Sequence, residues 1–154
     1  PCAPYYAAKA LMLASIAVSG RRSSSILDTP RVCTAPRHAY RPGRRWWRPG
    51  GRELIEHPIA VTRALRLPFI GTAITLAGPR GARMLARGVS DLAWVSLELH
   101  GIDFLDSGDG LVELAKSQRD LRIGWRAKLA ALTAAVAELR RGGYAFVRHA
   151  DGLD

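Results

Sequence analysis

Between residues 92 and 148 the spacing of apolar residues changes from a strand pattern to a helix pattern and back to a strand pattern. This order limits the possible folds more than any other feature. Residues 92–99 are mostly apolar, which is typical of a strand buried on both faces of a parallel sheet. Residues 125–141 predict a helix that ends at Gly142, and residues 144–148 predict a closing strand. The helix carries one apolar stripe, formed by Leu129, Leu132, Val136 and Leu139. The order strand, connection, helix, strand predicts a βαβ unit with parallel strands, and therefore an α/β fold.

The rest of the chain contains weaker signals. Residues 54–62 predict a strand, which Pro58 restricts to a sheet edge, a bulge or a strand end. Residues 67–76 are apolar and fit either a helix or a strand. Helices are also predicted at residues 5–19, 79–87 and 111–117. We find no repeat and no interdomain linker, so we expect residues 1–154 to form a single domain. Trp94 and Trp125 are expected in its core, and His57 and His149 are expected to be structural.

Residues 30–52 cannot form a regular helix or a central strand. They include four prolines, three glycines and seven arginines, so we interpret them as a long surface loop. Within it, Trp46 and Trp47 lie between arginines. Tryptophan can stack on a sugar ring or a base, and arginine can bind phosphate through two hydrogen bonds. The loop could therefore be a glycan subsite, a polyprenyl-phosphate contact or a nucleic-acid patch, or a solvated loop whose tryptophans pack back onto the domain.

The overall charge and the cysteine count restrict the possible classes of function. The 154 residues carry a formal net charge of +10, and arginine supplies 20 of the 23 basic residues. This excess fits either a compositional bias toward arginine or a site for polyanions. The cysteines, Cys2 and Cys33, cannot form a zinc site alone. No transmembrane segment is expected, because residues 10–18 are too short and residues 59–77 contain two arginines and a proline.

His100 is the strongest candidate for a catalytic residue, because it directly follows the predicted strand at residues 92–99. Reactive groups in α/β folds lie at the carboxyl ends of strands, where the loops converge. An imidazole at such a position can act as a general acid or base near neutral pH. Asp103 and Asp106 follow closely and could orient it. The alternative is an ordinary loop histidine with a surface hydrogen bond.

Several ordered motifs resemble those of the polysaccharide deacetylases of the NodB type, a family of carbohydrate esterases. The run Leu97-Glu98-Leu99-His100 resembles the last family motif, LxxH. The ending Leu-Arg-Arg-Gly-Gly followed by Tyr144-Ala-Phe-Val resembles the closing helix and strand of the family. Residues 54–62 resemble its penultimate strand, and residues 67–71 and 100–103 are similar to a bacterial subgroup. The resemblance covers most of residues 54–148.

This resemblance implies the C-terminal portion of a distorted (β/α) barrel, incomplete in this chain. The family consists of hydrolases that use a divalent metal, usually zinc, to remove N- or O-acetyl groups from a sugar or glycan substrate. By resemblance, His100 would be the general acid that protonates the leaving amine, and Leu97 would form part of the wall of the acetyl pocket. Leu97 could equally be a packing residue. Trp46 and Trp47 are expected to contact the substrate.

The metal-binding motifs of the family are absent from this sequence. The family binds its metal through an Asp-Asp pair and an HxxxH pair, whereas His38, His57, His100 and His149 include no two residues four apart. We therefore expect that this chain ligates no metal, that it is a C-terminal fragment of a longer deacetylase, and that it is inactive alone. The alternative function is a basic module that binds nucleic acid or anionic surfaces through residues 31–52. We do not expect recognition of a specific nucleic acid.

Overall fold

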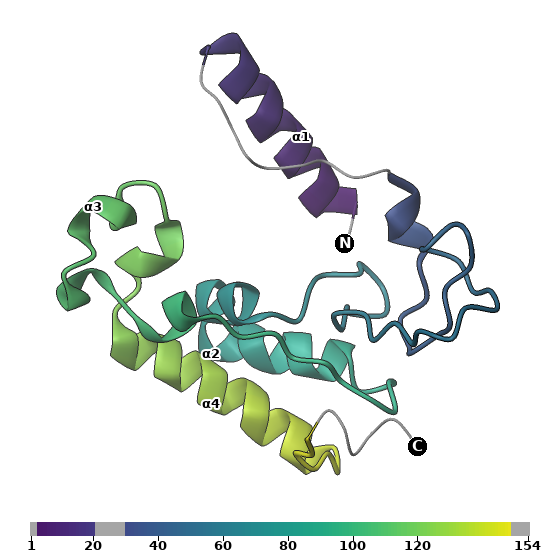
Figure 1. The fold of residues 1–154 in the computed structure, drawn as a ribbon. Helices are drawn as coiled ribbons and strands as arrows, with labels where there is room; N and C mark the ends of the chain where they lie inside the picture. Colours follow the sequence, from purple (N-terminus) through teal and green to yellow (C-terminus); the bar gives the residue numbers. More distant parts are fainter. Residues whose placement is uncertain (1–2, 21–29, 149–154) are drawn as a thin grey trace. The chain divides into compact units, whose positions relative to one another are not determined.

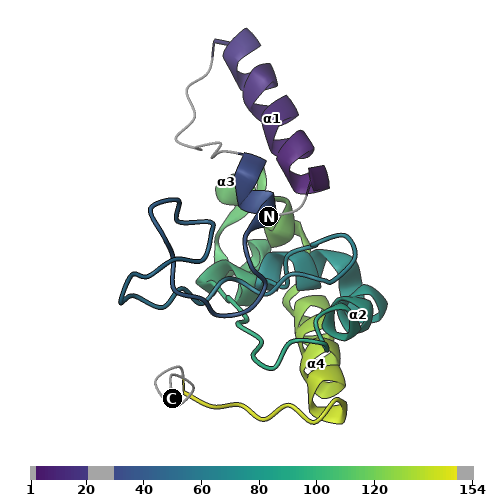
Figure 2. The same cartoon turned by 90° about the vertical axis from the view of Figure 1, so that its right-hand side faces the viewer.

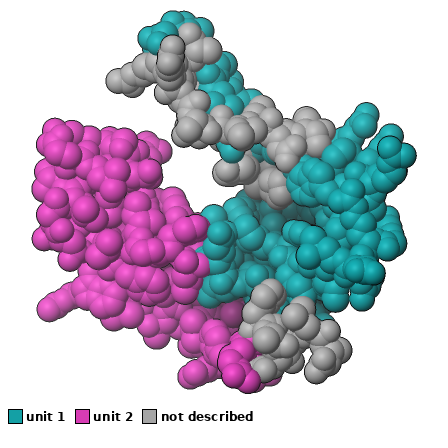
Figure 3. Space-filling model, viewed as in Figure 1, with its two compact units in different colours: residues 1–70, 91–98 teal, residues 71–90, 99–154 magenta. Residues whose placement is uncertain are grey.

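The computed structural model describes residues 3–20 and 30–148. The chain forms two compact units, which Figure 3 shows in different colours. The first unit comprises Pro1–Ile70 and Asp91–Glu98, and the second comprises Gly71–Ser90 and Leu99–Asp154.

Buried alanines and leucines of two helices build the core of the second unit. Helices α2 (Gly71–Gly88) and α4 (Trp125–Arg141) lie side by side in both ribbon views (Figures 1 and 2). Alanines at the contact allow the two helix axes to approach closely. The exposed edge of the pair carries an ion pair between Arg87 Nε and Glu138 Oε1 at 2.8 Å. The buried apolar side chains are Ile74, Ala82, Leu85, Ala86, Ala131, Leu132, Ala135 and Leu139.

Helix α2 is interrupted at a glycine–proline pair. Gly78 has φ 64° and ψ 179°, a conformation that favours glycine, and Pro79 cannot donate the next helical hydrogen bond. The helix predicted at residues 79–87 is confirmed as the part after this kink. The part before the kink begins at Gly71, so residues 71–76 of the ambiguous apolar segment are helical.

Helix α4 confirms the predicted bounds, but its buried face differs from the predicted stripe. Leu132 and Leu139 are buried as expected, whereas Leu129 is 43% exposed and Lys128 is completely buried. The buried face of α4 is therefore the one rich in alanine. A prediction based on large apolar residues alone does not identify this face. The prediction that Trp125 lies in the core is wrong: its side chain is 41% exposed at the first turn of the helix.

Four short elements connect α2 to α4 within the second unit. They include α3 (Val112–Ala115), which confirms the short helix predicted at residues 111–117. The other three are single turns of 3₁₀ helix: η2 (Gly101–Phe104), η3 (Ser107–Asp109) and η4 (Arg119–Arg122). Asp103 in η2 and Leu121 in η4 are fully buried. Each of these two turns is therefore attached to the core by a buried side chain.

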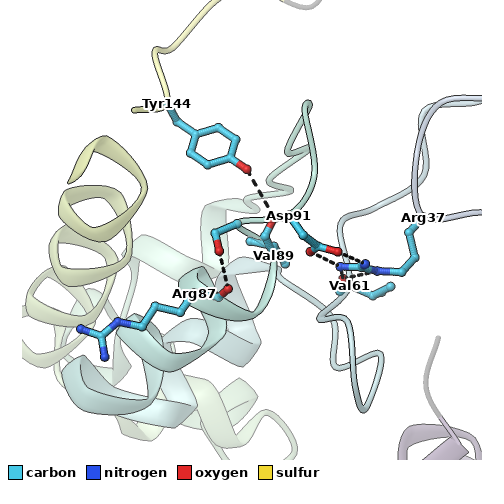
Figure 4. Close-up of polar contacts among 7 residues, drawn as sticks. Arg37, Val61, Arg87, Val89, Asp91 and Tyr144 are labelled. Carbon is cyan, nitrogen blue, oxygen red and sulfur yellow. Dashed lines mark hydrogen bonds and ion pairs between the residues drawn. The ribbon is translucent and has the colours of Figure 1, made fainter. Parts of the chain in front are cut away.

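The first unit contains α1 (Ala3–Val18), close to the helix predicted at residues 5–19, and η1 (Pro30–Thr34). The remainder is irregular, as expected for the loop at residues 30–52. Arg37 fixes this irregular region, as Figure 4 shows. Its guanidinium donates two hydrogen bonds to the Asp91 carboxylate, at 2.7 and 3.0 Å, and two to the Val61 carbonyl, at 3.0 and 2.7 Å. Arg37 thereby joins segments 24 and 54 residues apart in the sequence.

The predicted strands differ most from the structure. Within residues 3–20 and 30–148 the β pairing consists of isolated bridges, so residues 54–62, 92–99 and 144–148 do not form regular strands. Residues 54–62 pair antiparallel through Glu56 and Val61, and residues 92–99 pair parallel through Glu98 and Ile70. These bridges are isolated, and a strand requires several pairing positions in succession. The (β/α) barrel portion stays a prediction.

Candidate functional site

His100 caps the N-terminus of η2 in the second unit. Its backbone is extended, with φ −115° and ψ 160°, and the helical turn begins at the next residue. The imidazole is 57% exposed. The side chain predicted to carry the chemistry is therefore accessible to solvent while its backbone is fixed by a turn.

A buried carboxylate lies directly behind His100. Asp103 is 0% exposed, and its Oδ2 accepts a hydrogen bond of 2.7 Å from the His100 backbone N–H. The same Oδ2 lies 3.9 Å from His100 Nδ1, which is too long for a hydrogen bond but short enough for an electrostatic interaction with an imidazolium. The other oxygen, Oδ1, accepts a 3.1 Å hydrogen bond from the Thr72 hydroxyl at the start of α2.

Glycine at position 71 is required to accommodate this carboxylate. A Cβ atom at Gly71 would lie 2.0 Å from Asp103 Oδ2, far inside van der Waals contact. Because the first turn of α2 has no side chain there, the carboxylate can lie against the helix backbone. The sequence analysis did not identify Gly71 and Thr72 as site residues. The signal that could have found them is the start of a helix directly after an apolar segment.

Lys128 attaches the η2 loop to α4. Its ammonium is fully buried and donates hydrogen bonds to the carbonyls of Ile102, at 2.8 Å, and Leu105, at 2.6 Å. These two carbonyls flank Asp103, so one cation holds both sides of the segment that carries the buried carboxylate. Sequence reasoning missed Lys128, although a lysine three residues before Ala131 and four before Leu132 lies on the buried face of the helix.

Asp106 caps α4 instead of orienting His100. Its Oδ2 accepts a 2.7 Å hydrogen bond from the Trp125 backbone N–H, and its Oδ1 accepts one of 2.7 Å from Gly108 N–H. These two hydrogen bonds lower the pKa of the Asp106 carboxyl below its ordinary value, with a smaller contribution from the charge of Lys128. Gly124, at the N-cap position of α4, has no side chain to cap the helix, and Asp106 provides that function from 19 residues away.

The other predicted site residues belong to the first unit. Leu97 is half-buried. Trp46 is 44% exposed, Trp47 is half-buried, and their rings meet edge to face with centroids 5.8 Å apart. Thus the structure brings together the two tryptophans, and separately brings His100 together with Asp103. His57, expected to be structural, is half-buried with its ring 5.9 Å from that of Trp94, which is also half-buried. His149 lies outside the described residues.

The described part of the chain does not bring potential metal ligands together in one cluster. Among residues 3–20 and 30–148, no group of three or more His, Cys, Asp or Glu side chains is close enough to hold a metal ion. The carboxylates near His100 are used for other contacts: Asp103 accepts from His100 and Thr72, and Asp106 caps α4. The described residues therefore do not fit the metal centre that the family resemblance implies.

None of the helices in the described ranges has both the length and the apolar character needed to cross a lipid bilayer. Comparison with protein-family models, with curated proteins and with solved structures found no match for this chain.

Proposed function

We propose that this chain is the C-terminal part of a metal-dependent carbohydrate deacetylase, with His100 as its general acid. The proposal rests on the resemblance of the ordered motifs between residues 54 and 148 to the NodB-type family. One structural observation carries it: an exposed imidazole at position 100 lies 3.9 Å from a completely buried carboxylate. A substrate can reach the exposed imidazole from solvent. The buried Asp103 carboxylate places a fixed negative charge on the side of the imidazole that faces the protein.

The chemistry assigned to His100 is a single proton transfer. When an acetamido group is hydrolysed, the bond between the carbonyl carbon and nitrogen breaks, and the nitrogen must gain a proton to leave as an amine. A protonated His100 would deliver this proton from Nε2, because Nδ1 is the nitrogen nearest Asp103. The Asp103 carboxylate would stabilise the imidazolium before the transfer, as a carboxylate does for a catalytic histidine in general.

The rigidity of the surrounding loop supports the same proposal. Asp103 itself is held by His100 N–H and the Thr72 hydroxyl, and Lys128 binds the carbonyls on both sides of it. A general acid must be placed within hydrogen-bond reach of the leaving group, and a fixed backbone reduces the cost of that placement. The parallel bridge between Ile70 and Glu98 also agrees with a parallel-stranded parent fold.

The experiment uses the complete reading frame that contains these residues. The full-length protein, purified with zinc, should release acetate from an acetylated oligosaccharide, and H100A should lower kcat by about 10²–10⁴-fold. The matched control is H38A, because His38 is also an exposed histidine and is distant in sequence from the proposed site. Loss of activity in H38A but not in H100A would contradict the assignment. A reading frame without an Asp-Asp pair and HxxxH before residue 1 would contradict the enzyme class.

A further inference from the structure

The arginine-rich segment contains a tight hairpin, residues 41–50. Gly43 N–H donates to the Arg48 carbonyl at 2.9 Å, and Gly50 N–H donates to the Arg41 carbonyl at 2.7 Å. Arg48 N–H closes the tip by donating to the Arg45 carbonyl at 2.8 Å. These bonds define the conformation of the tip without a ligand, so a partner would not have to supply the free energy of ordering it.

Two glycines allow the arms of the hairpin to meet. A Cβ atom at Gly50 would lie 2.2 Å from the Cα atom of Gly43, so a side chain there would force the arms apart. The tip is also held by Tyr40, whose buried side chain donates from its hydroxyl to the Trp46 carbonyl at 2.7 Å. Burial is the main cause that raises the pKa of Tyr40, and the charge of Glu56 adds to it. The hydroxyl therefore stays protonated and keeps this bond at neutral pH.

The tip carries uncompensated positive charge. Arg44, Arg45 and Arg48 are exposed, and their side chains form no hydrogen bond or ion pair with any residue in the described ranges. Residues 30–52 contain seven arginines and no aspartate or glutamate. Outside the hairpin, arginines pair with carboxylates, as Arg37 does with Asp91 and Arg87 with Glu138. The hairpin tip therefore presents guanidinium groups whose hydrogen bonds are available to an external anion.

A single tryptophan completes the tip. Trp46 is 44% exposed, and Trp47 supports it from a half-buried position, edge to face at 85°. Tryptophan is enriched at the headgroup level of membranes, where one end of the ring is in contact with hydrocarbon and the other with water. Single-stranded nucleic acid is instead bound by several aromatic side chains that stack successive bases along a groove. With one exposed aromatic ring on a protruding turn, the tip fits a flat anionic surface better than a polynucleotide.

We infer that the hairpin 41–50 is a docking element for an anionic lipid surface, in which Arg44, Arg45 and Arg48 bind lipid phosphates and Trp46 enters the headgroup layer. Guanidinium groups bind phosphate oxygens through paired hydrogen bonds, and basic residues are attracted to anionic leaflets. This role is independent of the deacetylase proposal, because it involves neither His100 nor Asp103.

The test is co-sedimentation of the purified chain with vesicles. Vesicles made of equal parts phosphatidylglycerol and phosphatidylcholine should bind the chain, and added salt should weaken the binding. The variant R44Q/R45Q/R48Q should bind about 100-fold more weakly. The charge-matched control R80Q/R119Q/R126Q removes three exposed arginines of the second unit and should bind within about threefold of the wild type. Circular dichroism should show that both variants keep the helical content of the wild type.

The tryptophan is tested in the same way. W46A should lower binding to the anionic vesicles about fivefold, while W125A should leave it unchanged, since Trp125 is similarly exposed at 41% but lies in the second unit. The inference is overturned if pure phosphatidylcholine vesicles bind equally well, if both triple variants lose binding to the same degree, or if neither does. It is also overturned if a thymidine oligonucleotide binds more tightly than the anionic vesicles at equal phosphate concentration, which would identify the hairpin as a nucleic-acid site.

Discussion

The backbone N–H of His100 and the side chain of Asp103 close a ring that spans residues 100–103, with a hydrogen bond of 2.7 Å to Oδ2. Because the carboxylate is buried and the imidazole is exposed, this bond connects the core of the second unit to the backbone of its candidate catalytic residue. Most of our predictions concern the groups that hold this arrangement in place.

Replacing Asp103 tests the buried carboxylate. D103N keeps the shape of the side chain, but its amide nitrogen must face either the His100 N–H or the Thr72 hydroxyl, which both donate to the carboxylate. We expect the free energy of unfolding to fall by about 1–3 kcal/mol, measured by urea titration. E113Q is the control, because Glu113 is exposed and pairs with Lys116 on the surface. An equal effect of the two substitutions would show that Asp103 has no special structural role.

Gly71 should tolerate no side chain. In G71A the new methyl group would meet Asp103 Oδ2 at 2.0 Å, so the carboxylate or the first turn of α2 must move. We expect the variant to be destabilised by about 1–3 kcal/mol. G101A is a close control, because a Cβ atom at Gly101 meets nothing within 4 Å, and its effect should stay within about 0.5 kcal/mol. Thermal or urea unfolding of both variants distinguishes them, and similar stabilities would contradict the crowding.

Lys128 should contribute to stability through its hydrogen bonds. K128M keeps most of the side-chain volume but leaves the carbonyls of Ile102 and Leu105 without their donor. Loss of about 1–3 kcal/mol is expected in urea titration. The same substitution at Lys116, which is exposed and pairs with Glu113, should change stability by less than about 1 kcal/mol. Should K128M prove as stable as the wild type, the buried ammonium would not be needed to hold the loop.

Asp106 should make the stability of the chain depend on pH in the acid range. Its pKa is lower in the folded state than in the unfolded chain because it accepts hydrogen bonds from Trp125 and Gly108. The unfolded state therefore takes up protons first, so the contribution is complete above the ordinary carboxyl pKa and is lost as pH falls through the folded value. The difference in stability between wild type and D106N should be largest above about pH 5 and should shrink in more acidic buffer.

Unfolding curves of both proteins from pH 7 to pH 2 provide this measurement. A difference that stays constant over the whole range would show that the negative charge of Asp106 does not act through the cap of α4. Asp91 and Glu138 also have lowered pKa values, caused first by hydrogen bonds from Arg37 and Arg87, and they will contribute to the acid sensitivity of both proteins alike.

Helices α1 and α4 and the second part of α2 could be predicted from the sequence, because each depends on a pattern within itself, whereas the start of α2 was left open between helix and strand. Helix α4 begins at Trp125 and ends at Arg141 as expected, where the glycines begin. The strands could not be predicted in the same way, because a strand needs a partner elsewhere in the chain. Residues 92–99 have the composition of a buried strand, yet their pairing in the structure is a single parallel bridge from Glu98 to Ile70.

In the candidate site, too, contacts between residues close in sequence could be predicted, and contacts between distant residues could not. His100 and Asp103 are three residues apart, so their association followed from the sequence. Thr72 and Lys128 lie 31 residues before and 25 residues after Asp103, and only the packing of α2 against α4 brings them to it. Asp106 was expected to orient His100 but caps α4, because the N-terminus of that helix offers an unpaired N–H group at Trp125.

We propose His100 as the general acid of a carbohydrate deacetylase. The most direct measurement is acetate release from an acetylated oligosaccharide by the full-length, zinc-loaded protein, compared with its H100A variant. Our account predicts turnover by the wild type and a fall in kcat of about 10²–10⁴-fold in H100A. Equal turnover by the two proteins would contradict it.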